Sequence, residues 1–200
     1  MKGNYAKRGM LLIAAGILAI VLAGGLWVYN LWEESKAAEY SLQNAQVLLE
    51  IIHTLSAPEN ESALGPGGGK NYIMIDGEPY IGVLSLPALR LDLPVNNVWS
   101  YPALKRTPCR YSGDIQSGTL VIAAHNYKKH FGDISALAIG DAVTLTVADG
   151  SVIGYSVTDT EIIRPTDVGK MIYGKHDLTL FTCTYGGQDR VAVRCVRIIP

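Results

Sequence analysis

Two residues near the C-terminus have the types and the spacing for nucleophilic chemistry. Cys183 ends the apolar segment 178–183, and Arg190 begins a second strand after the turn predicted by Gly186-Gly187. A thiol at a strand end is held on a rigid scaffold and stays open to a groove. A fixed positive charge beside it favours the thiolate and stabilises a developing oxyanion. The segment therefore predicts a cysteine nucleophile with an arginine partner.

Side-chain alternation predicts which residues share a face with this thiol and this arginine. One face of the first strand holds Leu178, Leu180 and Thr182, and the other holds Thr179, Phe181 and Cys183. On the return strand, Arg194 shares the face of Arg190 and is its rival, whereas Cys195 faces the other way and is expected in the core. We favour Arg190 because it lies nearer the strand end where the thiol is expected.

A second apolar strand supplies the acid/base partner that thiol catalysis needs. A strand cysteine by itself is most often a buried hydrophobe, so the functional interpretation depends on this strand. Residues 119–124 are mostly apolar and end abruptly at His125, and a histidine distant in sequence is the usual partner of a catalytic cysteine. His130 lies five residues on, off the helical face of His125 and without an acidic cluster, so we predict no metal site there.

These segments together resemble the sortase family of Gram-positive cysteine transpeptidases. Thr179-Leu180-Phe181-Thr182-Cys183 matches the Thr-Leu-x-Thr-Cys motif of that family, Arg190 matches its arginine, and His125 matches its histidine. The resemblance covers residues 80–199. It implies an eight-stranded β-barrel in which Cys183 is the nucleophile, His125 is the general acid and base, and Arg190 stabilises the oxyanion. The acidic calcium-binding cluster of some class A sortases is not recognisable in this sequence, so we predict no metal, and we predict no cofactor.

By the same resemblance, the substrate is a secreted protein with a C-terminal, LPxTG-like sorting signal. The acceptor is an amine of a cell-wall precursor or of a pilin lysine. His125-Asn126, followed by Phe131-Gly132, is similar to the class B sortases. The connection 165–176 is short, whereas class B enzymes insert a long helix there, so the subclass stays open.

Two other functions use the same residues differently. A membrane-anchored thiol peptidase would also use Cys183 and His125 but would release the acid even when amine is abundant. A surface domain that only binds sorting peptides would not need the thiol. The presence of Cys183, His125 and Arg190 together disfavours this binding module, and nothing in the sequence excludes hydrolysis.

The composition bears on three further features: nucleic-acid binding, zinc binding and disulfide bonds. The formal net charge of −1 does not indicate a large basic surface for nucleic acid. The three cysteines lack the paired spacing of a zinc site, and their odd number leaves at least one thiol without an internal partner. A Cys109–Cys195 disulfide is open but has no positive support, and Cys109 is expected as a packed or half-exposed thiol.

The N-terminal third predicts a membrane anchor followed by a helical stalk. Residues 9–31 are almost wholly apolar and uncharged, which is long enough to span a bilayer as a helix. The basic residues before them predict a cytoplasmic N-terminus and an extracellular remainder, and a cleaved signal peptide is the less favoured alternative. Apolar residues then recur at helical spacing from Leu42 to Ile52, in a stalk or in a helix packed on the domain.

The rest of the chain predicts a mainly β domain with short helices. Strands are expected over 80–87, 89–95, 142–148 and 152–163, with a hairpin turn at Asp149-Gly150 and helical turns within 98–109 and 131–137. Many short strands with turn signals indicate a barrel. We therefore divide the chain into an anchor (1–32), a helical stalk with a Gly/Pro-rich linker (33–71) and a catalytic domain (72–200), single-pass in the cell membrane.

Overall fold

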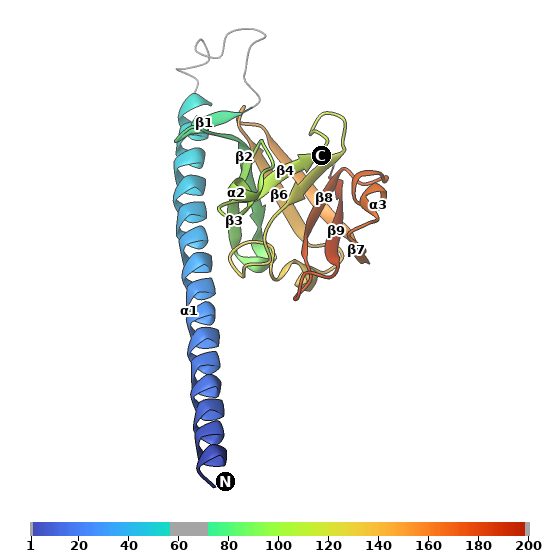
Figure 1. Ribbon diagram of the computed structural model, residues 1–200. Coiled ribbons are helices and arrows are strands. Elements are labelled where there is room, and N and C mark those ends of the chain that lie inside the picture. Colours follow the sequence, from blue (N-terminus) through green and yellow to red (C-terminus); the bar gives the residue numbers. More distant parts are fainter. Residues whose placement is uncertain (1, 57–71, 199–200) are drawn as a thin grey trace. The chain divides into compact units, whose positions relative to one another are not determined.

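The computed structural model describes residues 2–56 and 72–198, with side chains from Arg8 on. The linker predicted over 57–71 lies outside the described residues. Within these described residues, three helices, two short 3-10 helices and nine strands follow one another (Figure 1). They are α1 (Lys2–Leu55), β1 (Ile73–Ile75), β2 (Glu78–Leu86), η2 (Pro87–Leu89), β3 (Leu91–Asn96), α2 (Tyr101–Leu104), β4 (Cys109–Ser112), β5 (Leu120–Ala123), η3 (Ile134–Ala136), β6 (Ala142–Val147), β7 (Val152–Ile163), α3 (Val168–Ile172), β8 (Leu178–Cys183) and β9 (Arg190–Arg197).

Eight of the nine strands close into a barrel, as the sequence predicts. The strand order is β1-β2-β3-β4-β5-β8-β9-β7-β6, and β2 also pairs with β6, which closes the ring and leaves β1 outside it. The pairs β3–β4 and β5–β8 are parallel, and the other neighbours are antiparallel. Because a closed ring has no free edge, its backbone groups pair internally. This is the predicted mainly β, sortase-like architecture.

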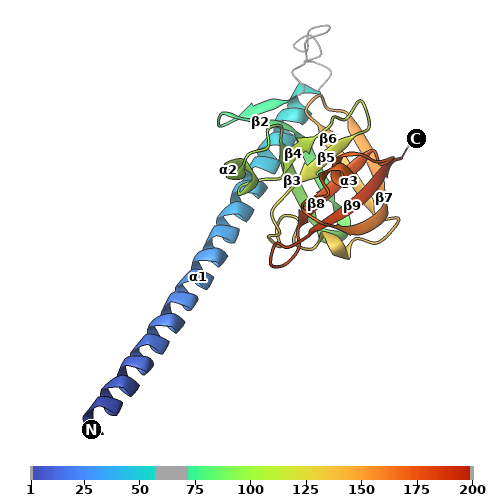
Figure 2. The same ribbon diagram turned by 45° about the vertical axis from the view of Figure 1, so that its right-hand side comes forward.

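Each strand places one face inside the barrel and the other outside. Leu180 on β8, Ile122 on β5 and Val193 on β9 belong to the interior cluster and are fully buried. Cys195 is also in this cluster, as its position on β9 predicts. Outside the barrel, α3 covers β9 and β5 through a smaller cluster around Met171 (Figure 2). α3 therefore covers part of the outer face that β5 and β9 share.

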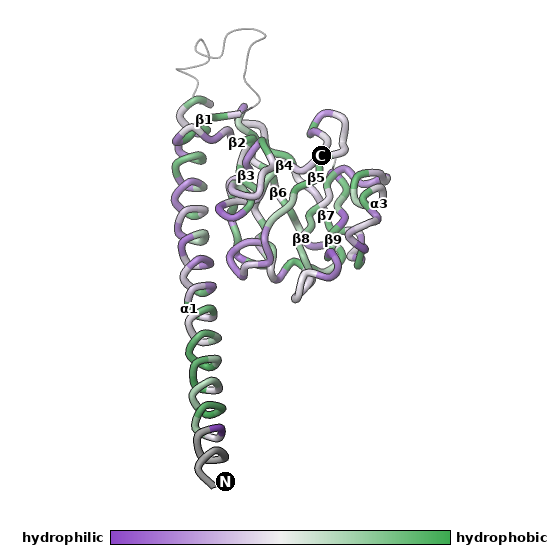
Figure 3. The backbone as a smooth tube through the Cα atoms, viewed as in Figure 1, coloured by the Kyte–Doolittle hydropathy of each residue, from purple (hydrophilic) through white to green (hydrophobic). Residues whose placement is uncertain are grey.

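The first 36 residues form one of two compact units in the chain. Within this unit, α1 is apolar and exposed, and the hydropathy reaches a mean of 2.6 over 18 residues (Figure 3). A helix of this length and composition can cross a membrane. Among the described residues it is the single helix with that property.

The last part of α1, from Ala37 on, belongs to the second unit together with the barrel. Ala45, Leu48 and Ile52 are buried against Tyr80 and Val83 of β2. Their spacing of three and four residues places them on one helical face. Residues 37–55 therefore pack on the barrel, which is the second of the two alternatives that the sequence leaves open for this stripe.

Replacing Leu48 by alanine should lower the free energy of unfolding of the barrel unit by about 2–4 kcal/mol, because the side chain is fully buried. Leu42 on the same helix is 56% exposed and provides the matched control. Leu42→Ala should change the free energy by less than about 0.5 kcal/mol. Urea unfolding of the full chain in detergent measures both, and equal effects would contradict this packing.

Candidate active site

The parallel pairing of β5 and β8 brings the ends of two distant segments together. Ala123 lies opposite Phe181 in this pair. One residue on, the Ala124 N–H donates to the Phe181 carbonyl (3.1 Å), and the Thr182 hydroxyl donates to the Ala124 carbonyl (2.9 Å). His125 follows Ala124 directly in the chain, so its segment lies beside the end of β8.

The antiparallel pairing of β8 and β9 adds the arginine. Cys183 and Arg190 are partners in this ladder. Cys183 and Arg190 thus lie at one level on two neighbouring strands, whose backbones are about 5 Å apart, and His125 follows two residues after the end of β5. The alternation puts Cys183 and Arg190 on the outer face, because Leu180 and Val191 face the interior cluster. Cys183 and Arg190 therefore lie together at one end of the barrel wall, and the segment that carries His125 follows the neighbouring strand β5.

Cys183 opens into a groove of about 230 Å³ on this outer face. Its lining includes Ala123, whose small outward side chain leaves room for a peptide backbone. One wall comes from the segment before β4, and the other comes from α3 and the loop that precedes it. The lining residues are Trp99, Tyr101, Leu104, Tyr111, Ala123, Ala124, Arg164, Pro165, Asp167, Val168, Met171, Phe181, Thr182, Cys183 and Arg190.

The turn between β8 and β9 holds the guanidinium of Arg190. Thr184 closes the turn, because its N–H donates to the Asp189 carbonyl (2.9 Å). Arg190 Nη1 donates to the carbonyls of Gly187 (3.1 Å) and Asp189 (2.9 Å). Within the described residues, nothing accepts from its Nε or Nη2. The half-buried guanidinium thus keeps donors for an oxygen in the groove.

Arg194, the rival of Arg190, is committed to the structure. It is 3% exposed. Its Nε donates to a Glu161 carboxylate oxygen (2.8 Å), and its Nη1 donates to the Thr179 hydroxyl (2.8 Å). It also donates to the Lys170 and Met171 carbonyls of α3 (2.6 and 3.3 Å). Arg194 therefore fastens α3, one wall of the groove, onto the barrel.

His125 is half-buried and stacks on a tyrosine that sequence reasoning did not single out. The rings of His125 and Tyr127 are 4.8 Å apart and nearly parallel, at 18°. His130 lies behind them, 5.6 Å from Tyr127, and is fully buried. Burial lowers the pKa of His130 to about 4, with nearby His125 acting in the same direction. His130 is therefore neutral near pH 7, and the described residues contain no group of metal ligands.

The match to a known family decides the identity of this fold. Residues 84–198, more than half of the chain, match the family model for a sortase domain. The chain belongs to the sortase family. The members of this family are cysteine transpeptidases. No curated protein matches the chain in sequence.

Solved sortase structures share this fold. A Clostridium perfringens sortase D5 transpeptidase is 18% identical, with a TM-score of 0.60 over 77% of this chain and 97% of its own. A Streptococcus pneumoniae sortase C is 26% identical, with a TM-score of 0.54 over 60% of this chain and 67% of its own. Sortase A from Corynebacterium diphtheriae is 19% identical, with a TM-score of 0.56 over 84% and 93%.

The three thiols of this sortase differ sharply in access. Cys183 is half-buried and faces the groove, whereas Cys109 and Cys195 are fully buried, and all three are free, without a disulfide. Burial raises the pKa of Cys109 and of Cys195 to about 12. Both therefore remain protonated at pH 8.

Iodoacetamide at pH 8 should consequently alkylate the native sortase once, at Cys183. Only the thiolate reacts, and the reagent has to reach it. Intact-mass spectrometry and peptide mapping measure the site, and the urea-unfolded chain should take up three groups. Rapid alkylation of Cys109 or Cys195 in the native protein would contradict their burial.

Proposed function

We propose that this sortase is a membrane-anchored transpeptidase that cleaves a C-terminal sorting signal through a thioester on Cys183. The observation that carries the proposal is the pairing of Cys183 with Arg190 beside one groove, next to the end of β5, two residues after which His125 follows. Cys183 is also the accessible thiol among the three, which suits a nucleophile.

Each of the three residues has one step in this mechanism. The Cys183 thiolate attacks the carbonyl carbon of the scissile peptide bond, and the guanidinium of Arg190 stabilises the oxyanion that forms. The C–N bond then breaks as His125 protonates the leaving amine, which leaves a thioester. An acceptor amine attacks this thioester and gives its proton to His125. The new amide forms, and the thiolate of Cys183 is regenerated.

The proposed substrate is a secreted protein with an LPxTG-like sorting signal. The acceptor is an amine of a cell-wall precursor or of a pilin lysine. An extended peptide is supported by two features of the groove: Ala123 leaves room for a peptide backbone, and the apolar side chains of the lining can contact apolar side chains of the peptide. The similar Streptococcus pneumoniae sortase C is described as having a pilin substrate, and this supports a pilin lysine as one of the two proposed acceptors.

Residues 1–32 are proposed as a single-pass anchor with a cytoplasmic N-terminus and an extracellular catalytic domain. Its apolar composition supports the anchor. The basic residues Lys2, Lys7 and Arg8 support the orientation. The peptide substrate and the amine acceptor would then both be met outside the cell.

Mass spectrometry of the full chain in detergent micelles tests this function. The protein is incubated with a panel of sorting-signal peptides, with and without an amine such as triglycine. A thioester on Cys183 that transfers to the amine, and that is lost in Cys183→Ala and His125→Ala, is the expected result. Acid as the sole product, even at high amine concentration, would replace transpeptidation by the hydrolytic alternative. Peptide binding without an adduct would leave only a binding module.

A further inference from the structure

One wall of the groove is a chain of touching aromatic rings. The segment 97–106, here called the α2 loop, brings Trp99, Tyr101 and Leu104 to the groove. The ring of Trp99 lies 5.1 Å from that of Tyr101 and 5.8 Å from that of Tyr111, edge-on in the second case. Tyr111 in turn lies 5.1 Å from Phe181, also edge-on. Phe181 and Cys183 share a face of β8, so this wall leads directly to the thiol.

The internal hydrogen bonds of the α2 loop are those of one short helix and of the turn that follows it. Its helix is four residues long, and the Ala103 N–H donates to the Ser100 hydroxyl that caps it (3.1 Å). Ala103 is the one buried residue of the helix, while Tyr101 is 72% exposed. So short a helix is not stable by itself. The position of the wall must therefore be set by contacts outside the loop.

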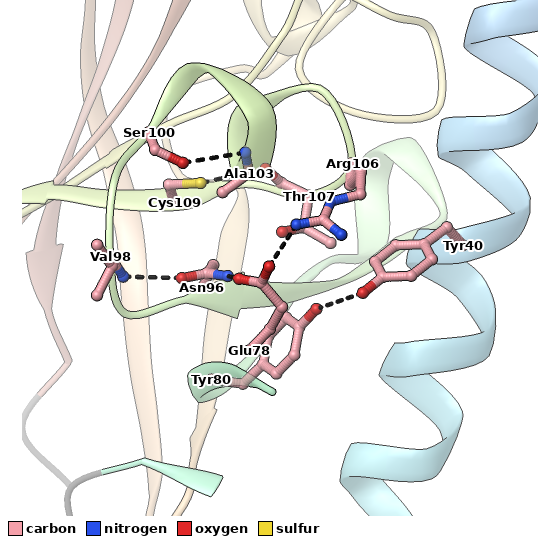
Figure 4. A network of polar contacts seen from close by, with 10 residues as sticks. All are labelled: Tyr40, Glu78, Tyr80, Asn96, Val98, Ser100, Ala103, Arg106, Thr107 and Cys109. Atoms are coloured by element: carbon pink, nitrogen blue, oxygen red, sulfur yellow. Dashed lines mark hydrogen bonds and ion pairs between the residues drawn. The ribbon is translucent and has the colours of Figure 1, made fainter. Parts of the chain in front are cut away.

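The Asn97 N–H donates to the Pro79 carbonyl of β2 (2.7 Å), and the carboxylate of Glu78 provides further contacts at both ends of the α2 loop (Figure 4). At the C-terminal end, Arg106 donates to Glu78 Oε1 in an ion pair. At the N-terminal end, Asn96 Nδ2 donates to Glu78 Oε2 (2.8 Å), and the Val98 N–H donates to Asn96 Oδ1 (2.8 Å). Glu78 thus binds Arg106, two residues after α2, directly, and it is linked through Asn96 to Val98, the residue before Trp99.

We call the contacts of Glu78 with Arg106 and Asn96 the Glu78 clamp. Its residues are held by strands and by α1. Glu78 begins β2, and Asn96 ends β3 with only 1% of its surface exposed. The guanidinium of Arg106 also lies over the ring of Tyr40 on α1, 5.4 Å from its centroid, which is cation–π geometry. The Tyr40 hydroxyl is 3.4 Å from the hydroxyl of the buried Tyr80. The packed part of α1 thereby holds the arginine in place.

We propose that Glu78 is a positioning residue that holds the Trp99–Tyr101 wall against the groove and so sets the affinity for the peptide substrate. This inference rests on the proposed function. The substrate class that fits is an extended peptide with an apolar or aromatic side chain that packs on this wall. Glu78 lies outside the lining of the groove, so it acts through the loop and not on the reacting atoms.

Glu78→Gln tests the clamp because it removes the charge and keeps the shape. We expect the KM of the sorting peptide to rise about tenfold, which corresponds to the loss of one charge-assisted contact. The kcat should stay within about twofold, and so should the rate of Cys183 alkylation by iodoacetamide, because the reacting groups are untouched. A fall of kcat and alkylation together, with KM unchanged, would overturn the proposal.

Two further variants separate positioning from general loss of structure. Arg106→Gln should raise KM as Glu78→Gln does, and the double variant should be no worse than either single one, because both remove the same ion pair. Asp149→Ala is the matched control, since the bonds of its carboxylate to described residues are those to Ser151 in the β6–β7 hairpin. It should leave KM unchanged. Additive effects of Glu78→Gln and Arg106→Gln would contradict a shared clamp.

Hydrogen exchange of the full chain in detergent gives a readout that needs no substrate. In Glu78→Gln, the backbone amides of residues 98–107 should exchange at least about threefold faster, while those of β8 and β9 should not change. If the unmutated chain turns over no peptide, the proposed function fails, and the clamp is judged on exchange alone. Unchanged exchange over residues 98–107 would then overturn it.

Discussion

Replacing Cys183 by alanine should reduce turnover of a sorting peptide by about 10⁴-fold or more, to the background rate, because no other thiol can replace it. Cys109 and Cys195 are fully buried and protonated, so neither reaches the groove. Folding should be unaffected, since the half-buried thiol contributes little to the core. The measurement is the rate of peptide cleavage and the mass of the protein after incubation with peptide.

Cys195→Ala is the matched control for this loss. It removes a thiol from the same barrel, but from the interior cluster, so its cost should be about 1 kcal/mol of unfolding free energy with turnover retained. Cys183→Ser tests the nucleophile separately, because a hydroxyl fits the space but is far less nucleophilic. Substantial cleavage by Cys183→Ala, or its loss in Cys195→Ala alone, would place the nucleophile elsewhere.

Strong alternation and clear turn signals made some strands predictable from the sequence. The segment 178–183 is a strand with the predicted bounds, and so is 152–163, which follows the Asp149-Gly150 turn. β4 was not predicted, because Cys109–Ser112 is short and mixed in polarity and its strand conformation comes from pairing with β5. α3 was also missed, because five residues fastened by Arg194 carry no helical pattern.

One part of the candidate site could likewise be predicted from the sequence, and another part could not. The pairing of Cys183 with Arg190 follows from a hairpin, which is local and can be predicted from the turn. The position of His125 depends on the parallel pairing of β5 with β8, which join segments far apart in the chain. No pattern within either segment specifies that partner, so only the family resemblance indicated it. The aromatic wall of the groove was missed for the same reason. Its rings Trp99, Tyr111 and Phe181 are separated in the sequence, and the contacts of Tyr111 with the other two form only in the folded barrel.

Replacing Arg190 by alanine should lower kcat by about 10²–10³-fold, which is the usual cost of removing one oxyanion donor. The free energy of unfolding should change by less than about 1 kcal/mol, because the residue is half-buried and bonds only carbonyls of its own turn. Arg190→Lys should recover little of the loss, since an ammonium lacks the planar fork of donors. Steady-state kinetics and urea unfolding of the full chain in detergent measure the two effects.

Arg194→Ala should give the opposite pattern, and the contrast decides which arginine serves the chemistry. Its removal leaves the buried Thr179 hydroxyl and the Met171 carbonyl without their donor and breaks the pair with Glu161. We expect a loss of about 2–4 kcal/mol of unfolding free energy. The kcat of the folded fraction should fall by less than about tenfold, because α3 loosens but no group that contacts the thioester is lost. If Arg194→Ala abolishes turnover at full stability while Arg190→Ala does not, the two roles are reversed.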